Sequence, residues 1–356
     1  MNFKAIFYIK SPLQYLNAIE ARNHYGYAEE ESLLILHADN KNLDQLTQLI
    51  KRDRWGGIIN LNGSGIKPDV QSKVDLSVRH SLFHNNVFSI TKLSYLARKF
   101  SPVDKVFIGD AGNPLMQHLA NVVVVNEVVL LDDGIASYLY AEWRKKGWHG
   151  EEPRLKKKLS RIIKRLFFSL RDGLPPELTF YSACNIEVTD RDKLVQNKFD
   201  VLRKAFKDTV ESNSIFFLGS SLVESGFCTE GDYIHQLSLV NAYYAGAPVV
   251  YVAHRREPVE RIEKIKHALG WETVLFKYPI ECQLVVEGPR PRQLAAFVSS
   301  ALENCHAIFG KSLPIVSFRF NPNSFSLASP NRGKRIWELY GKYKANESSS
   351  FKVVDL

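Results

Sequence analysis

Cysteine is scarce in this chain of 356 residues, and the four that occur lie far apart in sequence: Cys184, Cys228, Cys282 and Cys305. Their spacing matches neither a CxxC metal-binding pair nor the disulfide framework of a small secreted domain. We therefore expect free thiols and a cytoplasmic location, where thiols stay reduced. With 45% apolar and 24% charged residues, the chain has an ordinary globular composition and is long enough for two domains.

Long apolar runs are also missing. Residues 3–9 form a short run that Lys4 interrupts and that no small-residue cleavage site follows, which predicts a first strand rather than a signal peptide. The longest later run, residues 122–131, contains Asn126 and Glu127 and is shorter than the ~20 residues a helix needs to cross a bilayer. The sequence therefore predicts no membrane-spanning segment.

Acidic residues are outnumbered, since 38 Asp and Glu stand against 47 Lys and Arg, a formal net charge of +9. Such an excess suits an acidic substrate, nucleic acid or an anionic membrane. Residues 154–171 carry eight Lys and Arg and no acid, while their apolar residues recur every three or four positions. This pattern predicts a basic amphipathic helix, which could bind anionic lipid or pack its apolar stripe on its own domain.

Short β-branched runs alternate with segments of helical period along the chain. The expected strands form two series, the first at residues 4–9, 33–37, 57–61, 105–108 and 122–131 and the second at 215–218, 249–252, 273–276 and 283–286. Alternating strands and helices predict an α/β protein with two mostly parallel sheets. The polar segment 190–213 separates the series, so we place the domain boundary near residue 205. We expect residues 346–350 to form a loose tail.

Polar motifs follow several of these strands, where parallel α/β sheets bind their ligands. They are Ser11-Pro12-Leu13-Gln14, Gly109-Asp110-Ala111-Gly112-Asn113, Asp132-Asp133-Gly134, Gly219-Ser220-Ser221 and His254-Arg255-Arg256-Glu257. A cleft between two domains would bring a carboxylate from the first half against a histidine and arginines from the second. Each motif alone also fits a turn or a helix cap.

Two Ser-x-x-Glu segments, which begin at Ser221 and Ser300, fit the capping box that starts a helix. Such a helix N-terminus offers free amide groups and a positive dipole end, and it therefore also suits a phosphate group.

The order of the motifs resembles that of the bacterial sialyltransferases and polysialyltransferases. The similar positions run from residue 3 to 305 and comprise Ser11-Pro12-Leu13-Gln14, Asp132-Asp133-Gly134, residues 218–224, His254, Glu281 and Ser299-Ser300. The resemblance implies an α/β fold of GT-B type, with two Rossmann-like domains facing across a cleft. Residues 1–205 would hold the acceptor and the general base. Residues 206–356 would hold the CMP-sugar, and their last helix could pack back on the first domain.

The resemblance also implies a role for each matching residue. Asp132 would be the general base, and His254 would support the leaving CMP phosphate. The further donor-side residues would be Gly219, Ser220, Arg255, Glu281, Ser299 and Ser300, with Glu281 on the ribose, and the acceptor-side residues Ser11, Gln14, Asp110, Asn113 and Asp133. The chain departs from the family at Arg255, where proline is usual, and at Val252, where a lysine near the cytosine is often found.

The expected activity is an inverting transfer of sialic acid, or a related nonulosonic acid, from its CMP donor to a hydroxyl of a bacterial surface glycan. Lipopolysaccharide, O-antigen or capsule precursors are the expected acceptors, which could be lipid-linked at the inner membrane. We expect no metal ion and no further cofactor.

Two alternatives stay open. One keeps the fold and uses CMP-Kdo or another nucleotide sugar. The other is a non-enzymatic basic module that docks on a membrane or on nucleic acid through residues 154–171. Nucleic acid is not an expected partner, because no recognised RNA- or DNA-binding motif occurs.

Overall fold

The computed structural model describes residues 2–61, 85–147, 155–321, 324, 330–345 and 347–356. The chain divides into two compact units, Met1–Val201 and Leu202–Leu356, each with its own sheet. The division falls four residues before the expected boundary, within helix α7 (Asp200–Lys207).

The first unit is built on a seven-stranded sheet in the order β3-β2-β1-β4-β5-β6-β7, in which every neighbouring pair is parallel. Its strands are β1 (Ala5–Ile9), β2 (Ser32–Leu36), β3 (Gly57–Asn60), β4 (Val103–Ile108), β5 (Val125–Leu131), β6 (Thr179–Ser182) and β7 (Lys193–Gln196). Its helices are α1 (Pro12–His24), α2 (Asn40–Ile50), α3 (Asn85–Phe100), α4 (Pro114–Val122), α5 (Ile135–Lys145) and α6 (Leu155–Phe168), with a 3-10 turn at Glu29–Glu31.

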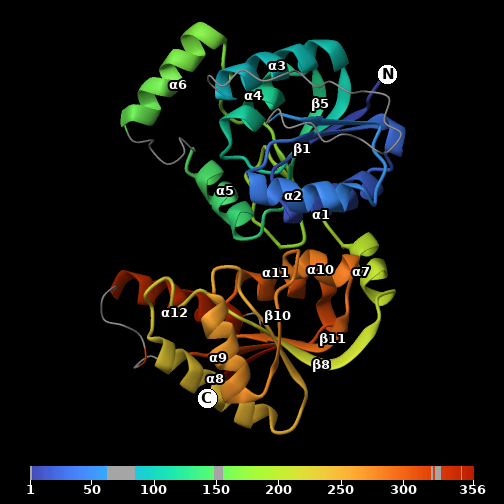
Figure 1. Ribbon diagram of the computed structural model, residues 1–356. Helices are drawn as coiled ribbons and strands as arrows, with labels where there is room; N and C mark the ends of the chain where they lie inside the picture. The colour runs from blue at the N-terminus through green and yellow to red at the C-terminus, as the bar shows by residue number, and fades with distance from the viewer. Residues whose placement is uncertain (1, 62–84, 148–154, 322–323, 325–329, 346) are drawn as a thin grey trace. The chain divides into compact units, whose positions relative to one another are not determined.

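Strands β1 and β2 are apolar except for Ser32 at the start of β2, because both faces of the sheet are covered. Every residue of these two strands is buried. Helices α3 and α4 lie over one face and α1 and α2 over the other (Figure 1). A continuous apolar run is the sequence pattern of a central parallel strand, which explains why these strands could be predicted.

The second unit has a six-stranded parallel sheet in the order β10-β9-β8-β11-β12-β13. Its strands are β8 (Glu211–Leu218), β9 (Val249–Val252), β10 (Glu272–Val274), β11 (Arg290–Ala296), β12 (Ile315–Arg319) and β13 (Phe351–Asp355). Its helices are α8 (Glu230–Tyr244), α9 (Val259–Leu269), α10 (Ile280–Val286), α11 (Ser300–Phe309) and α12 (Pro330–Ala345), with a 3-10 turn at Gly310–Ser312.

Both sheets have the strand order of a dinucleotide-binding fold, in which the chain starts near the middle and reverses direction across the sheet. The reversal lies between β1 and β4 in the first unit and between β8 and β11 in the second. The α/β class with two parallel, Rossmann-like sheets is therefore confirmed. The ligand site of such a sheet lies beyond the strand ends on either side of the reversal.

The structure differs from the sequence-based expectations at residues 283–286 and after Ser221. Residues 283–286 form the end of α10 rather than a strand, because Ile280 and Leu284, four residues apart, share one buried helix face. The segment after Ser221 is a turn, in which Glu224 pairs with Arg261 instead of capping a helix.

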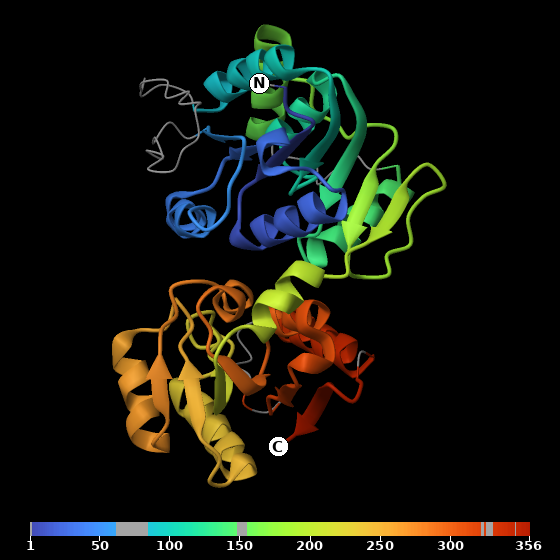
Figure 2. The same cartoon turned by 90° about the vertical axis from the view of Figure 1, so that its right-hand side faces the viewer.

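The C-terminal end is ordered rather than loose. Residue 346 lies outside the described residues, but Ser350 is buried and Phe351 begins β13, which pairs with β12. Figure 2 shows this strand as the last arrow before the C-terminus. Helix α12 packs within the second unit, where its Tyr343 hydroxyl donates to the Ser299 carbonyl oxygen at 2.7 Å.

Within the described residues, no helix has both the length and the apolar character needed to cross a bilayer. All four cysteines are free.

Candidate active site

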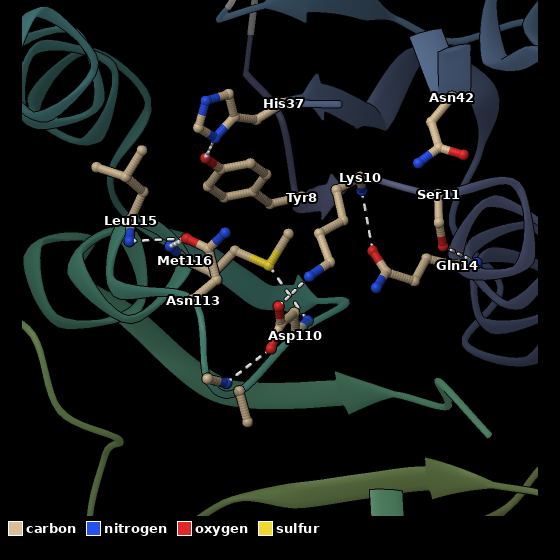
Figure 3. A network of polar contacts seen from close by, with 12 residues as sticks. Tyr8, Lys10, Ser11, Gln14, His37, Asn42, Asp110, Asn113, Leu115 and Met116 are labelled. Carbon is tan, nitrogen blue, oxygen red and sulfur yellow. Dashed lines mark hydrogen bonds and ion pairs between the residues drawn. The ribbon is translucent and has the colours of Figure 1, made fainter. Parts of the chain in front are cut away.

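The carboxyl ends of the parallel strands gather at one edge of the first sheet, and an ion pair lies at the point of reversal. Lys10 follows β1 and Asp110 follows β4, and the Lys10 ammonium group donates to the Asp110 carboxylate. Tyr140 donates its hydroxyl to the same carboxylate at 2.5 Å and the Gly112 amide donates at 2.8 Å. Figure 3 shows the Lys10 and Asp110 side chains pointing toward each other.

Asp110 is ionised at neutral pH. Burial alone would raise the pKa of its carboxyl group, but the bonds from Lys10 and Tyr140 and the Lys10 charge outweigh burial and hold the pKa below its ordinary value. The pair fixes a positive and a negative group beside each other at the edge of the sheet.

Ser11 and Asn113 cap helices. The Ser11 hydroxyl accepts from the Gln14 amide at 3.3 Å and starts α1, and the Asn113 side chain accepts from the Leu115 and Met116 amides and starts α4. Gln14 is buried, and its side-chain oxygen accepts from the Lys10 amide at 2.9 Å. These residues lie at the carboxyl edge of the first sheet, as predicted, and their hydrogen bonds hold the turns that follow β1 and β4.

The Asp132 carboxylate is surrounded by donors. One oxygen accepts from the Gly134 amide at 2.9 Å and the Ser137 hydroxyl at 2.8 Å, and the other accepts from the Ser182 hydroxyl at 2.6 Å and the Ala183 amide at 3.3 Å. The residue is 7% exposed. Asp132 therefore ties the turn before α5 to the end of β6.

Asp133 has a different environment. It is partly buried, and its backbone amide donates to the Ser137 hydroxyl at 3.0 Å. Burial raises the pKa of its carboxyl group to about 6; Gln14 and Lys10 oppose the rise, and the Asp110 and Asp132 charges add to it. A carboxylate with a pKa near neutrality at a strand end is suited to accepting a proton.

A buried network joins the strand ends of the second unit. Glu257 accepts from the Tyr251 hydroxyl at 2.6 Å and from the His254 amide at 2.6 Å. Tyr251 in turn contacts the Tyr233 hydroxyl at 3.1 Å, which accepts from the Ser220 amide at 3.2 Å. The network brings the predicted Ser220 and His254 into one cluster.

Burial raises the pKa of Glu257 to about 7, although the bonds from Tyr251 and His254 lower it. Gly219 leaves no room for a side chain here, because an added Cβ would lie 2.4 Å from a Glu257 carboxylate oxygen and 2.6 Å from the Tyr251 hydroxyl. Gly219 is therefore required by close packing against this network.

A side-chain hydrogen bond joins Glu281 on α10 to α11. The side-chain amide of Asn304 donates to the Glu281 carboxylate at 2.7 Å, and burial raises the pKa of Glu281. Ser299, rather than the expected Ser300, caps α11, since its hydroxyl accepts from the Ala301 amide at 3.3 Å. Ser300 and Arg255 are exposed.

The structure groups the predicted residues by unit. The acceptor-side set lies along the carboxyl edge of the first sheet, and the donor-side set lies along the carboxyl edge of the second sheet and on α10 and α11. Sequence reasoning gave no role to Lys10, Ser137, Tyr140, Ser182, Tyr233, Tyr251, Glu257 and Asn304. Glu257 is part of a predicted motif, and Lys10, Ser137, Tyr251 and Asn304 stand within three residues of one, which was a usable signal. Tyr140, Ser182 and Tyr233 lie farther along the chain from any predicted motif.

In the described part of the chain, no group of three or more His, Cys, Asp or Glu side chains is arranged to hold a metal ion.

Comparison with known proteins rests on structure alone, because no family model and no curated protein sequence matches the chain. The UDP-GlcNAc 2-epimerase of Methanocaldococcus jannaschii has a TM-score of 0.52 and 10% identity, over 99% of this chain and 95% of that one. Another UDP-N-acetylglucosamine 2-epimerase also has a TM-score of 0.52, with 12% identity over 98% and 89%. The chain has a GT-B type fold.

An α/β-galactoside α-2,3-sialyltransferase from Photobacterium phosphoreum aligns over 99% of this chain and 98% of that one, with a TM-score of 0.47 and 12% identity. The α/β architecture with two parallel, Rossmann-like sheets is confirmed at the level of the fold by the two epimerase structures.

Proposed function

We propose that the protein is an inverting glycosyltransferase that moves sialic acid, or a related nonulosonic acid, from a CMP donor to a hydroxyl of a bacterial surface glycan. The GT-B type fold supports a nucleotide-sugar enzyme. The observation that carries the proposal is that the motif residues lie at the ligand-binding edge of each sheet, with the Asp133 carboxyl group, whose pKa is raised, in one unit and His254, Arg255 and the start of α11 in the other.

The acceptor proton requires a base, and the geometry favours Asp133 over Asp132. Asp132 already accepts four hydrogen bonds, which occupy both of its carboxylate oxygens and leave little room for a bond from an acceptor hydroxyl. Asp133 has a raised pKa and lies in the same turn. We therefore assign proton transfer to Asp133 and the shaping of the turn to Asp132, in place of the base role that the resemblance implies for Asp132.

On the donor side, the CMP phosphate would be held by His254, Arg255 and the start of α11 with Ser299 and Ser300. Free amides and the positive end of the helix dipole favour an anion at such a start. The bond between the anomeric carbon and the phosphate oxygen breaks, and CMP leaves with the electron pair. The acceptor oxygen bonds to the anomeric carbon and gives its proton to Asp133. Glu281, held by Asn304, would accept from the ribose hydroxyls.

In this proposal the leaving group is a monophosphate, whose charge these side chains and amides neutralise without a bound metal ion. The acceptor would be a lipopolysaccharide, O-antigen or capsule precursor, presented by a lipid carrier at the inner membrane.

A nucleotide screen tests the donor. Only a nucleotide that binds the native state raises its melting temperature, so CMP should raise it more than UDP or GDP at equal concentration. Glu281→Ala should remove most of the CMP shift. A larger shift with UDP would move the proposal to a UDP-sugar enzyme, and no shift with any nucleotide would contradict it.

A further inference from the structure

Helix α6 exposes a stripe of large apolar side chains to solvent. Ile162, Ile163, Leu166 and Phe167 are all exposed, with 74% of both Leu166 and Phe167 accessible. Positions i, i+1, i+4 and i+5 lie on one side of a helix. In Figure 1, α6 stands at the side of the first unit, outside α3 and α4. The sequence left two interpretations open, and one of them packed the stripe on its own domain. The exposure of these four side chains excludes that packing for this part of the stripe.

The segment directly after α6 is hydrogen-bonded to α4. The Arg171 amide donates to His118 Nδ1 at 3.0 Å, and the Gly173 amide donates to the Gln117 side chain at 2.9 Å. Asn121 donates to the Gly173 carbonyl oxygen at 2.7 Å, and Leu170 is buried. The chain that follows the stripe is thus fixed to α4, while α6 itself contacts α3.

Basic residues flank the stripe in the sequence. Residues 154–171 carry eight Lys and Arg and no acid. Lys164 and Arg165 lie next to the exposed apolar positions, and Arg165 forms a 2.5 Å ion pair with Asp172 just beyond the segment. A helix with an apolar stripe and a basic flank matches the interface of an anionic bilayer, where acyl chains meet phosphate groups.

We propose that α6 docks the protein on an anionic lipid surface, with the stripe at Ile162, Ile163, Leu166 and Phe167 inserted below the head groups. Charge complementarity selects this occupant. A second copy of the chain would bring two strongly basic stripes together, which repel each other. Nucleic acid would neutralise the charge but leave the large apolar side chains in water. The inference is independent of the proposed catalysis.

Vesicle flotation tests this docking surface with the full chain. The vesicles contain phosphatidylcholine alone or with one-third phosphatidylglycerol. The test variant is Leu166→Ser/Phe167→Ser. The control is Val124→Ser/Val259→Ser, which removes two valines that are 66% and 69% exposed and lie outside α6. Melting temperatures verify that both variants fold.

We expect the native protein and the control to float with the anionic vesicles, and the α6 variant to bind at least tenfold more weakly. Binding should fall with added salt, and neutral vesicles should retain little protein. Absence of native binding, or an equal loss in the control, would overturn the proposal. So would dimerisation or RNA binding that depends on Leu166 and Phe167 in place of lipid binding.

Discussion

Replacing Asp133 with asparagine should stabilise the protein while it removes activity. In the folded chain, burial raises the pKa of this carboxyl group from 3.8 to about 6. Since one pKa unit corresponds to ~1.4 kcal/mol, the ionised form costs the fold about 3 kcal/mol. The native carboxyl holds its proton at pH values where the unfolded chain has lost its own. Its contribution to stability is therefore full below pH 4 and is lost as the pH rises to about 6.

Asparagine does not ionise, so the stability of Asp133→Asn carries no contribution from this carboxyl group. The difference in free energy of unfolding between the variant and the native protein should therefore grow as the pH rises from 4 to about 6. Urea unfolding should show little difference near pH 4 and up to about 3 kcal/mol in favour of the variant at pH 7. Loss of the base should lower the turnover number by ~10²–10⁴. The native turnover number should rise through pH 6, as Asp133 loses its proton.

Asp132→Asn is the matched control, one position away. Its new amide group faces donors from Ser137, Ser182 and two backbone amides. A buried donor without an acceptor costs ~1–3 kcal/mol, so this variant should be less stable at every pH. If Asp133→Asn keeps full activity while folded Asp132→Asn loses it, the assignment of the base is wrong. If Asp133→Asn gains no stability between pH 4 and pH 7, the reasoning from burial is wrong.

Three further predictions concern the second unit. Gly219→Ala should destabilise the fold by ~1–3 kcal/mol in urea unfolding, because its methyl group would displace Glu257 or Tyr251. The same displacement should weaken CMP binding in calorimetry. Unchanged CMP binding would contradict a place for this turn in the donor site. Glu257→Ala should lower the free energy of unfolding by ~1–3 kcal/mol in thermal unfolding, since it leaves the Tyr251 hydroxyl and the His254 amide without their acceptor. Glu257→Gln should retain the fold. Its stability relative to the native protein should increase above pH 7, where the native carboxyl group is ionised. Asn304 holds the Glu281 carboxylate in place, so Asn304→Ala should raise the dissociation constant for CMP by about tenfold. An unchanged dissociation constant would contradict the assignment of Glu281 to the nucleotide site.

Much of the architecture could be predicted from the sequence because central parallel strands leave a strong pattern. Strands β1 and β2 are buried on both faces and appear as continuous apolar runs. Strand β13 was missed because it follows a polar segment and lies at an edge of its sheet. Helix α10 was mistaken for a strand, since its short apolar run fits either period and only its packing decides.

The candidate site could be predicted as positions but not as contacts. The positions of Asp110, Asp132 and His254 could be predicted because each follows a strand, and the carboxyl ends of parallel strands lie at the same edge of their sheet. The partners that set their chemistry come from distant parts of the chain: Ser182 is 50 residues from Asp132, and Tyr140 is 30 residues from Asp110. Sequence spacing carries no signal for such contacts.

The most direct test of the proposed function is a transfer assay in which the native protein receives CMP-sialic acid with and without a bacterial surface glycan precursor. Mass spectrometry measures free CMP and the mass of the glycan. We predict release of CMP that depends on the precursor, together with a glycan heavier by one sialic acid residue. A glycan unchanged in mass with CMP-sialic acid and with every other CMP-sugar, while a UDP-sugar is consumed, would contradict the account.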